Sequence, residues 1–516
     1  MLSERRSTFS IVFILSLVLT AVLYQWQRNK GFSLWDEGFL WYGVQGVLSG
    51  DVPIRDFMSY DIGRYYFSAV FLILFGDSGI LALRLSLAIV QFVGLFLGLQ
   101  LVCQNIKNNN LMYMVISGVT LAVWMFSRHK VYDVTLSIIL ITVVSYLLND
   151  RSKKAFFTTG LCVGLVAVFG RNHAVYGVVA CLASFLWIGT SSETHKQVGT
   201  GQGIVIWAFG VMLGFSPILS MAVLVPNFGV KFLESIRFLV EIKATNIFLP
   251  VPWPWKVDFS DPVFAMSIHY IVVGIFFICL FVYGPIAVLL LCWRRLQGKW
   301  CSPLSIATSF LSIPYAHYAY SRADIPHLAH SIFPVLIGIL YFFNKTAGNI
   351  KLVMTSILCV LSLFSMHVYY PGWQMIINKD WSETEIGGDK IYVDTKTLRE
   401  VALLKKLHSD FITEGERFLV VPFWPGAYPL LRGKSPTWEI YALFPRTTEF
   451  QQLEIDRIKF ADPRFVLILD KALDGRDDLR YRNTHPLIYQ YIVNNFNRIT
   501  YNLPNNEYQL YVKLKN

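Results

Sequence analysis

The chain has 516 residues, 54% of them hydrophobic and only 15% charged, whereas a soluble domain usually carries about 25% charged residues. The apolar residues stand in long runs, which excludes an ordinary soluble globular protein and indicates a membrane protein. The formal net charge is +11. Because the basic residues stand between the apolar runs, they indicate membrane topology and contacts with lipid headgroups, not nucleic-acid binding.

Eleven apolar runs predict membrane-spanning helices. The first run, at residues 9–24, is followed by no small-residue cleavage site, so we expect an uncleaved first span and not a signal peptide. The other runs lie at residues 79–101, 111–127, 131–148, 155–170, 174–189, 204–225, 268–292, 303–319, 328–343 and 350–368. Several are shorter than the roughly 20 residues of a usual span. The stretches 111–148 and 155–189 are therefore each either two short helices joined by a polar elbow or one long broken segment.

The distribution of basic residues predicts the topology of these spans. If the N-terminus is inside and the spans alternate, twelve basic residues fall at inner ends and short inner loops: Arg5, Arg6, Lys107, Arg151, Lys153, Lys154, Lys196, Arg294, Arg295, Lys299, Lys345 and Lys351. Four fall in the short outer elbows: Arg128, Lys130, Arg171 and Arg322. This bias agrees with the positive-inside rule. An odd number of spans then places the C-terminal part of the chain outside.

Two of the predicted outer loops are long, at residues 25–78 and 226–267. The first contains an apolar run at residues 65–76 that is too short to span a membrane, so we expect a helix lying at the membrane interface. The second contains alternating proline and tryptophan at residues 250–255, which predicts a stiff interfacial lid.

The composition becomes that of a soluble domain from about residue 372. Apolar residues at helical spacing over 396–410 predict a helix, and short β-type runs follow at 417–422, 464–470 and 508–513. We therefore predict an α-helical polytopic membrane protein with a small C-terminal α/β domain. Residues 1–371 would form the transmembrane domain with its two long external loops, and residues 372–516 the soluble external domain.

Polar and ionisable residues gather in the predicted outer loops, where they need a reason because they are costly at membrane depth. The four sets are Asp36, Glu37, Asp56, Asp61 and Arg64; Arg128, His129, Lys130 and Asp133; Arg171, Asn172 and His173; and residues 321–327, which include Arg322, Asp324 and His327. Arginine binds phosphate by paired hydrogen bonds, and a carboxylate can deprotonate an attacking hydroxyl. The sets together suit chemistry on a lipid-linked phosphate sugar at the membrane surface.

Each candidate also has a structural interpretation. Asp36 follows Ser33 by three positions, which is the spacing of a helix capping box, and Glu37 can stabilise the same helix through its dipole. The side chains of Arg64 and Arg322 can reach lipid headgroups without any role in chemistry. Both interpretations stay open for these residues on the sequence alone.

Several motifs resemble a known group of membrane enzymes. Residues 35–38 (Trp-Asp-Glu-Gly) follow the first span, residues 49–51 come one helix length later, and residues 63–66 lead into a short run that ends at Phe75-Gly76. This pattern resembles the first external loop of the GT-C glycosyltransferases, the group that contains protein mannosyltransferases and the lipid A aminoarabinose transferase. Residues 171–173 and 322–328 are similar to polar elbows of bacterial members, and residues 415–426 to the external domain of some members. Many relatives have a Lys-Pro-Pro-type turn where this chain has residues 61–64.

The resemblance implies a multispan GT-C-like fold and a sugar donor carried on a polyprenyl phosphate. It implies that Asp36, with Glu37 beside it, provides the catalytic carboxylate, and that Asp133 matches a second external carboxylate. The implied activity is an inverting hexosyl or pentosyl transfer to a glycan, lipid or protein outside a bacterial inner membrane. The substrate-binding candidates are Arg64, Asp133, Arg171, His173, Arg322, Asp324 and His327. No cofactor is required; a divalent cation held by Asp36 and Asp133 is compatible with the sequence, although no spacing demands one.

Two other functions remain open. An envelope-glycan polymerase or ligase is also a multispan protein with large outer loops, but it depends on arginine and histidine more than on an early acidic loop. A lipid or glycan transporter would place ionisable residues near the middle of the membrane, often on helices broken at glycine or proline. The gathering of ionisable residues at one predicted face favours the glycosyltransferase.

Overall fold

The computed structural model describes residues 2–104, 110–190, 198–242, 246–257, 259, 264–346 and 348–513. Contacts divide the chain into two compact units, each built from two separate stretches. The helical unit comprises Met1–Trp26 and Leu87–Tyr370, and the mixed unit comprises Gln27–Ser86 and Pro371–Asn516. Lys107 and Lys196, two of the basic residues used for the topology, lie outside the described residues.

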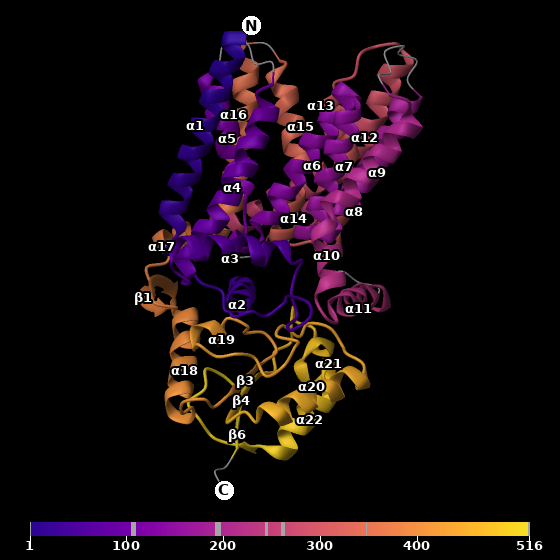
Figure 1. The fold of residues 1–516 in the computed structure, drawn as a ribbon. Coiled ribbons are helices and arrows are strands. Elements are labelled where there is room, and N and C mark those ends of the chain that lie inside the picture. The colour runs from indigo at the N-terminus through magenta and orange to yellow at the C-terminus, as the bar shows by residue number, and fades with distance from the viewer. Residues whose placement is uncertain are drawn as a thin grey trace. The chain divides into compact units, whose positions relative to one another are not determined.

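The helical unit contains most of the predicted spans. Its helices are α1 (Leu2–Gln27), α4 (Ile80–Val102), α5 (Leu111–Trp124), α6 (Val131–Asp150), α7 (Lys153–Phe169), α8 (Arg171–Gly189), α9 (Thr200–Gly214), α10 (Ser216–Leu224), α11 (Phe228–Glu241), α12 (Phe264–Leu296), α13 (Pro303–Ser321), α14 (Ile325–Ser331), α15 (Phe333–Asn344) and α16 (Gly348–Met366). Two single turns of 3₁₀ helix, η1 (Arg128–Lys130) and η2 (Pro254–Lys256), lie between them, and a third, η3 (His367–Tyr369), follows α16. The helices α1 and α4 continue across the boundary between the units. Within the unit, α13 packs against α6, α8, α12 and α15 (Figure 1).

Every predicted span contains a helix, and two of them are broken. The pairs α9–α10 and α14–α15 bend by 50° and 54°. A proline stands at the start of α10 and of α15, where its missing N–H and fixed φ permit a new helix but end the previous one. Of the described helices, six are long and apolar enough to cross a membrane, or up to eight if each bent pair is one span. A polytopic helical membrane protein is thus confirmed, whereas the count of eleven stays a prediction.

The stretch 155–189 forms two helices and not one broken segment. The helices α7 and α8 are separated by Gly170 alone and pack on each other. A Cβ atom at Gly177, seven residues after this glycine, would lie 3.4 Å from the side chain of Val163, seven residues before it, so the chain reverses at Gly170. The stretch 111–148 likewise contains two helices, α5 and α6, with η1 between them.

The helices α7 and α9 approach each other along a seam of glycines. Cβ atoms at Gly160 and Gly164 would lie 2.0 and 2.2 Å from the backbone oxygens of Trp207 and Val211. In the other direction, Cβ atoms at Gly210 and Gly214 would lie 2.5 and 2.1 Å from backbone oxygens of α7. Both helices therefore carry glycines four residues apart, the pattern that lets membrane helices pack backbone to backbone.

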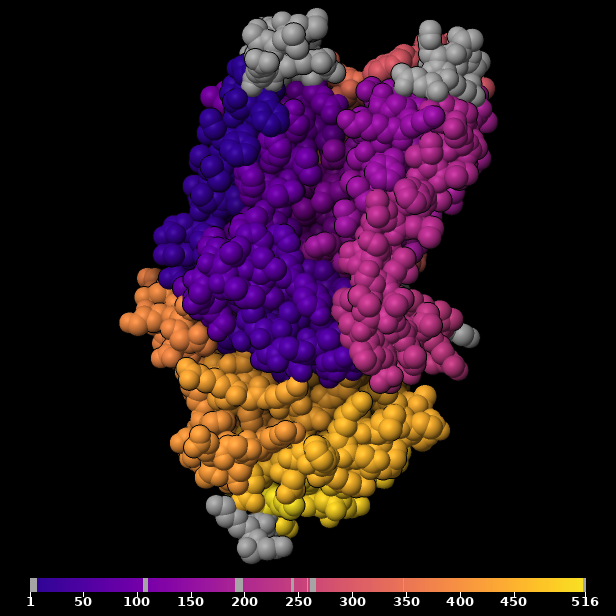
Figure 2. Space-filling model, in the orientation of Figure 1, coloured from indigo at the N-terminus to yellow at the C-terminus, as the bar shows by residue number. Residues whose placement is uncertain are grey.

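The helix α11 lies in the predicted lid loop and is amphipathic. Apolar side chains on one side of it are exposed: Leu233, Ile236, Leu239 and Val240. Charged residues occupy the other side and form two ion pairs within the helix, Lys231–Glu234 and Arg237–Glu241. Figure 2 shows this helix uncovered at the surface of the molecule. An exposed apolar face opposite a charged face is typical of a helix lying at a membrane interface.

The mixed unit combines the first long loop with the C-terminal part of the chain. Its elements are α2 (Asp36–Leu48), α3 (Gly63–Phe75), α17 (Pro371–Ile377), β1 (Trp381–Ile386), β2 (Asp389–Asp394), α18 (Thr395–Phe411), β3 (Phe418–Val421), α19 (Ala427–Leu430), α20 (Thr448–Ala461), β4 (Phe465–Leu469), η4 (Asp477–Leu479), α21 (Tyr481–Thr484), α22 (Pro486–Asn495), β5 (Asn497–Arg498) and β6 (Tyr508–Val512). The predicted helix at 396–410 and the strands near 417–422, 464–470 and 508–513 are confirmed.

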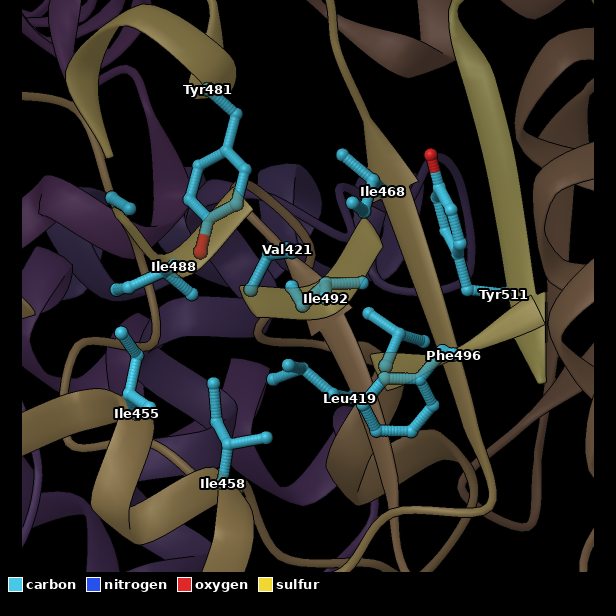
Figure 3. Packing of buried hydrophobic residues seen from close by; sticks show 12 residues of the cluster. Leu419, Val421, Ile455, Ile458, Ile468, Tyr481, Ile488, Ile492, Phe496 and Tyr511 are labelled. Carbon is cyan, nitrogen blue, oxygen red and sulfur yellow. The ribbon is translucent and has the colours of Figure 1, made fainter. Parts of the chain in front are cut away.

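A four-stranded sheet forms the centre of this unit. Its strand order is β3-β4-β6-β5; β3 and β4 are parallel, and β6 is antiparallel to both of its neighbours. All residues of β3 and β4 are buried, as expected for strands covered on both faces. Figure 3 shows one face, where side chains of β3, β4 and β6 meet those of α20 and α22, including Leu419, Ile458, Ile468, Ile492 and Tyr511.

The first long loop packs on the C-terminal part of the chain within the mixed unit. The ring of Trp35 stacks on that of Phe423, with centroids 4.5 Å apart. A Cβ atom at Gly38 would lie 2.5 Å from the Cα of Gly426, so α2 and the start of α19 meet backbone to backbone. The predicted helix at 65–76 is confirmed as α3. The division into a transmembrane domain ending at residue 371 and an external domain after it concerns the membrane and stays a prediction.

Candidate functional site

Three of the predicted polar elbows meet at one place in the helical unit. Asp133 stands in the first turn of α6, His173 is the third residue of α8, and His327 lies in α14. The helix α13 ends at Ser321 just before the fourth elbow and packs against α6, α8 and α14. We call this group the elbow cluster: Asp133, His173, Tyr315, Tyr318, Arg322, Asp324, His327 and His330. The cluster therefore joins segments that are far apart in the sequence. His330, for example, is hydrogen-bonded to the backbone of Ser127, which precedes it by 203 residues.

A buried hydrogen-bonded chain runs through the first half of the cluster. The Nε2 of His173 lies 2.9 Å from Oδ1 of Asp133, and its Nδ1 lies 2.7 Å from the hydroxyl of Tyr315. These three side chains are 4% exposed or less. If the Asp133 carboxylate is ionised, it accepts from Nε2–H, and the Tyr315 hydroxyl donates to Nδ1. The two partners thus determine the orientation and the tautomer of the imidazole.

Asp324 organises the second half of the cluster. Its Oδ2 accepts from Nε of Arg322 at 2.6 Å, and its Oδ1 lies 2.6 Å from Nδ1 of His327. The same carboxylate caps α14 by accepting the backbone N–H of His327 at 3.0 Å. Arg322 also donates to the backbone oxygen of Ile247 at 3.2 Å. The structure therefore brings together Arg322, Asp324 and His327, which the sequence had predicted as one polar elbow.

Two buried ring nitrogens in the cluster have no hydrogen-bond partner among the described residues. They are Nε2 of His327 and Nδ1 of His330. The ring of Tyr318 lies beside both imidazoles, with centroids 5.5 and 6.4 Å away. The Nε2 of His330 accepts the backbone N–H of Ser127 at 3.4 Å. Buried polar atoms almost always have partners in folded proteins, so the two nitrogens mark a place where a polar group of a ligand can bind.

The sequence analysis did not select His330. Its position three residues after His327 on the same helix was a usable signal, because residues three apart share one face of a helix. Arg171, which the sequence did select, extends toward the lid loop: its Nη1 donates to Ser235 at 2.9 Å, and its guanidinium lies 5.1 Å from the ring centroid of Phe232 in α11.

Asp36 begins α2 in the mixed unit. Its backbone N–H donates to Oγ of Ser33 at 3.1 Å, so the serine half of the predicted capping box is present. The Asp36 side chain is half-buried, and its carboxylate contacts the hydroxyl of Tyr441 at 3.5 Å. Within the described residues this carboxylate forms no ion pair. It is therefore ready to accept a hydrogen bond or a proton.

The neighbouring carboxylate of Glu37 is in a different state. It is buried and forms a two-fold ion pair with Arg84, with both N–O distances at 2.7 Å. Arg84 donates in addition to the backbone oxygens of Arg28 and Gly31. Such a buried guanidinium with a bidentate carboxylate holds the start of α4 and the start of α2 together. Of the two adjacent carboxylates, one is neutralised inside the protein and the other is not.

Arg64 lies in the first turn of α3 and is buried, with its guanidinium 5.5 Å from the ring centroid of Tyr60. Nearby in the sequence, burial raises the pKa of Asp56, but hydrogen bonds from Arg55 and from the backbone of Val52 outweigh it and lower the pKa below its ordinary value. Asp56 is thus held as a carboxylate that stabilises the loop between α2 and α3.

No three His, Cys, Asp or Glu side chains are grouped as metal ligands in the described parts of the chain. Asp36 and Asp133, the candidate ligands for a divalent cation, belong to different units, and the cation stays a prediction. The meeting of the Asp36 loop with the elbow cluster also stays a prediction.

The chain shares its fold with solved membrane proteins. ArnT from Cupriavidus metallidurans bound to undecaprenyl phosphate superposes with a TM-score of 0.52 at 12% identity, over 98% of this chain and 98% of that chain. The apo structure of ArnT gives a TM-score of 0.53 at 10% identity, over 99% and 98%. At these identities the likeness shows a common fold alone, and the expected GT-C-like fold is confirmed.

The chain is less similar to the oligosaccharyltransferase of Archaeoglobus fulgidus in the apo form. The TM-score is 0.47 at 10% identity, over 96% of this chain and 73% of that chain, and a score of this size supports no argument. No protein-family model matches the sequence, and no curated protein matches it.

Proposed function

We propose that this chain is a membrane glycosyltransferase that moves a sugar from a polyprenyl phosphate to an acceptor outside the membrane. The fold common to this chain and ArnT, which extends over nearly the whole of both chains, carries the proposal. ArnT is an aminoarabinose transferase, and its structure was solved with undecaprenyl phosphate bound. The donor of this chain would then be a sugar on a lipid of the same class, and the acceptor a glycan, lipid or protein.

Asp36 is the general base of the proposed reaction. It takes the proton of the acceptor hydroxyl, whose oxygen attacks the anomeric carbon with inversion while the bond from that carbon to the phosphate oxygen breaks. The contrast with its neighbour supports this choice, because the Glu37 carboxylate is occupied by Arg84 whereas Asp36 has no ion pair within the described residues. Glu37 then supports the loop from inside and does not react.

The elbow cluster is the proposed site of the departing polyprenyl phosphate. When the bond breaks, the phosphate oxygen keeps the electron pair and gains negative charge, which hydrogen-bond donors and cations stabilise. The unpartnered Nε2 of His327 supports this role: Nδ1–H faces the Asp324 carboxylate, so the imidazolium form presents Nε2–H as a donor. The guanidinium of Arg322 stands in the same elbow. Arg64 and Arg171 remain candidates for binding the donor.

The proposed location is a bacterial inner membrane with the C-terminal part of the chain outside. The excess of basic residues in the predicted inner loops supports this orientation. The amphipathic α11, whose apolar face is exposed, would then lie at the outer interface. Its Ser235 accepts a hydrogen bond from Arg171, two residues before His173 of the elbow cluster.

The test is a transfer assay on the full chain in proteoliposomes. The donor is undecaprenyl phosphate carrying a radiolabelled hexose or pentose, membranes supply the acceptor, and the release of undecaprenyl phosphate is measured. His327→Gln should lower turnover by about 100-fold, the usual cost of removing one donor to a developing negative charge. The matched control is His317→Gln, because His317 is an exposed histidine on α13.

Two results of this assay would count against the proposal. If the wild-type chain moves the labelled lipid across the bilayer but leaves the sugar–phosphate bond intact, the chain is a transporter. If turnover occurs but the two histidine variants behave alike, the elbow cluster does not hold the leaving group.

A further inference from the structure

The mixed unit contains a cavity of about 450 Å³ that none of the proposed reaction steps uses. It lies between α2, the turn joining β1 to β2, α18 and the end of α19. Trp41 and Tyr42 of α2 form part of its wall, and Lys405 and Arg432 contribute charge. A volume in this range is typical of sites for small molecules.

The wall of this cavity is held in place by packing and hydrogen bonds. Trp41 donates through Nε1 to the backbone oxygen of Ser78 at 3.2 Å. Gly387, at φ +62°, faces the ring of Trp41 so closely that a Cβ atom there would lie 2.5 Å from it. Tyr42 packs edge to face against the rings of Phe57 and Tyr428, with centroids 5.6 Å apart in both cases. The cavity is therefore preformed, which lowers the cost of binding.

The charges around the cavity favour an anion. Lys405, Arg432 and Lys434 line it, against the carboxylates of Asp51 and Glu385. Lys434 pairs with Asp51 at 2.6 Å, and Lys405 donates to the backbone oxygen of Glu385 at 2.7 Å, which leaves its charge uncompensated by that contact. The exposed side chain of Arg432 forms no hydrogen bond or ion pair with any described residue.

The chain turns at Arg432, just after α19. This residue follows α19 at φ +53°, a left-handed conformation that is common after a helix but that normally belongs to glycine. Gly433 stands directly after it. The turn brings the side chain of Arg432 to the wall of the cavity.

We propose that this cavity binds a saccharide that carries an anionic group, either a phosphate or a carboxylate. Lys405 and Arg432 bind the anion, since a guanidinium matches the geometry of both groups. The space exceeds what one phosphate needs, and Gln45 and Ser49 offer hydrogen bonds suited to sugar hydroxyls. The inference that this site holds the acceptor glycan rests on the proposed function. The inference that it binds anionic saccharides does not depend on that function.

The experiment measures binding to the full chain in nanodiscs of neutral lipid, without a donor. Radiolabelled glucose 6-phosphate and glucuronate are compared with glucose and inorganic phosphate by equilibrium dialysis. At least one of the two anionic sugars should bind at least tenfold more tightly than both glucose and inorganic phosphate. Binding of glucose 6-phosphate would indicate a phosphate site, and binding of glucuronate a carboxylate site. Binding should weaken as salt is added, because the contacts are between partly exposed charges.

Two variants locate the site. Arg432→Gly removes the guanidinium and places glycine where φ is +53°, so the fold is retained. Lys405→Gln removes the second cation. Each should weaken binding of the anionic sugar at least tenfold. The matched controls are Lys406→Gln, one residue further along α18, and Arg498→Gln in β5; both residues are exposed and neither lines the cavity.

Several outcomes would overturn the inference. Absence of binding to the wild-type chain rejects the site, and equal binding of inorganic phosphate and glucose 6-phosphate rejects the saccharide. Equal loss in the cavity variants and in the controls rejects the location. Because no sugar donor is present in this binding measurement, failure of the proposed transfer reaction leaves its result unaffected.

Discussion

The two adjacent acidic residues at the start of α2 should respond in opposite ways to the same kind of substitution. Asp36→Asn and Glu37→Gln each remove one negative charge while keeping size and shape nearly constant. The structure assigns the first carboxylate to the surface of the mixed unit and the second to its interior. We expect Asp36→Asn to lose turnover and keep stability, and Glu37→Gln to lose stability.

The magnitude for Glu37 follows from its contacts. The carboxylate is buried and receives two hydrogen bonds of 2.7 Å from Arg84, and breaking a buried ion pair on one side costs about 3–5 kcal/mol. Arg84 keeps its bonds to the backbone oxygens of Arg28 and Gly31, and the glutamine oxygen still accepts one hydrogen bond. The expected loss is therefore near the lower limit, about 3 kcal/mol.

Asp36→Asn should change the stability of the protein little and its turnover strongly. Its contact with Tyr441 at 3.5 Å is at the limit of a hydrogen bond, so the change in stability should stay within about 0.5 kcal/mol. Loss of a general base lowers turnover by about 100-fold, which corresponds to about 2.7 kcal/mol in the activation free energy.

The assay combines thermal unfolding in detergent with turnover of the labelled donor. Glu383→Gln is the matched control for Glu37, because Glu383 is an exposed glutamate of β1 whose ion pair with Lys390 lies at the surface. Near-normal turnover of a folded Asp36→Asn variant would refute the base. Normal stability of Glu37→Gln together with lost turnover would show that the roles of the two carboxylates are the reverse of those proposed.

Two further predictions concern the helical unit. Reporter fusions placed after Lys299 and after Tyr370 should report opposite sides of the membrane, because three predicted spans separate these positions; equal signals would reject the span count. Gly160→Ala should destabilise the chain by about 1–3 kcal/mol in thermal unfolding, since the new methyl group meets the backbone oxygen of Trp207. Gly189→Ala, where the nearest atom is 3.8 Å away, should have little effect, and equal behaviour of the two variants would disprove the seam.

Local sequence patterns account for the elements of the fold. Every predicted span formed a helix, the short run at 65–76 became α3, and the short β-type runs after residue 372 became strands. The cap at Ser33 was also visible, because its spacing to Asp36 involves only one turn of chain. These features depend on periodicity and on contacts between near neighbours, which a single sequence displays directly.

Local patterns account for the candidate site only in part. The polar elbows were recognisable because ionisable residues interrupt apolar runs. The structure joins two of them by the Asp133–His173 hydrogen bond, and the ring of Tyr318 contacts both His173 and His327 of the third. The role of Tyr315 in that chain and the unpartnered nitrogen of His330 were not foreseen. Both depend on which helices pack together. In the sequence of an apolar helix, no pattern distinguishes an aromatic or histidine side chain that binds a ligand from one that only packs.

The sequence by itself determined the membrane class of the protein, its helices and the small α/β domain, because hydrophobic spacing is a property of each segment. Only the tertiary structure decided that the first loop folds with the C-terminal residues, that Glu37 is occupied by Arg84, and that Arg432 stands at a cavity without an ion pair to any described residue. The first loop and the C-terminal residues that it contacts are hundreds of residues apart, and one sequence contains no record of such distant contacts. The two carboxylates at positions 36 and 37 look alike in the sequence, and their different burial and pairing separate them in the folded protein.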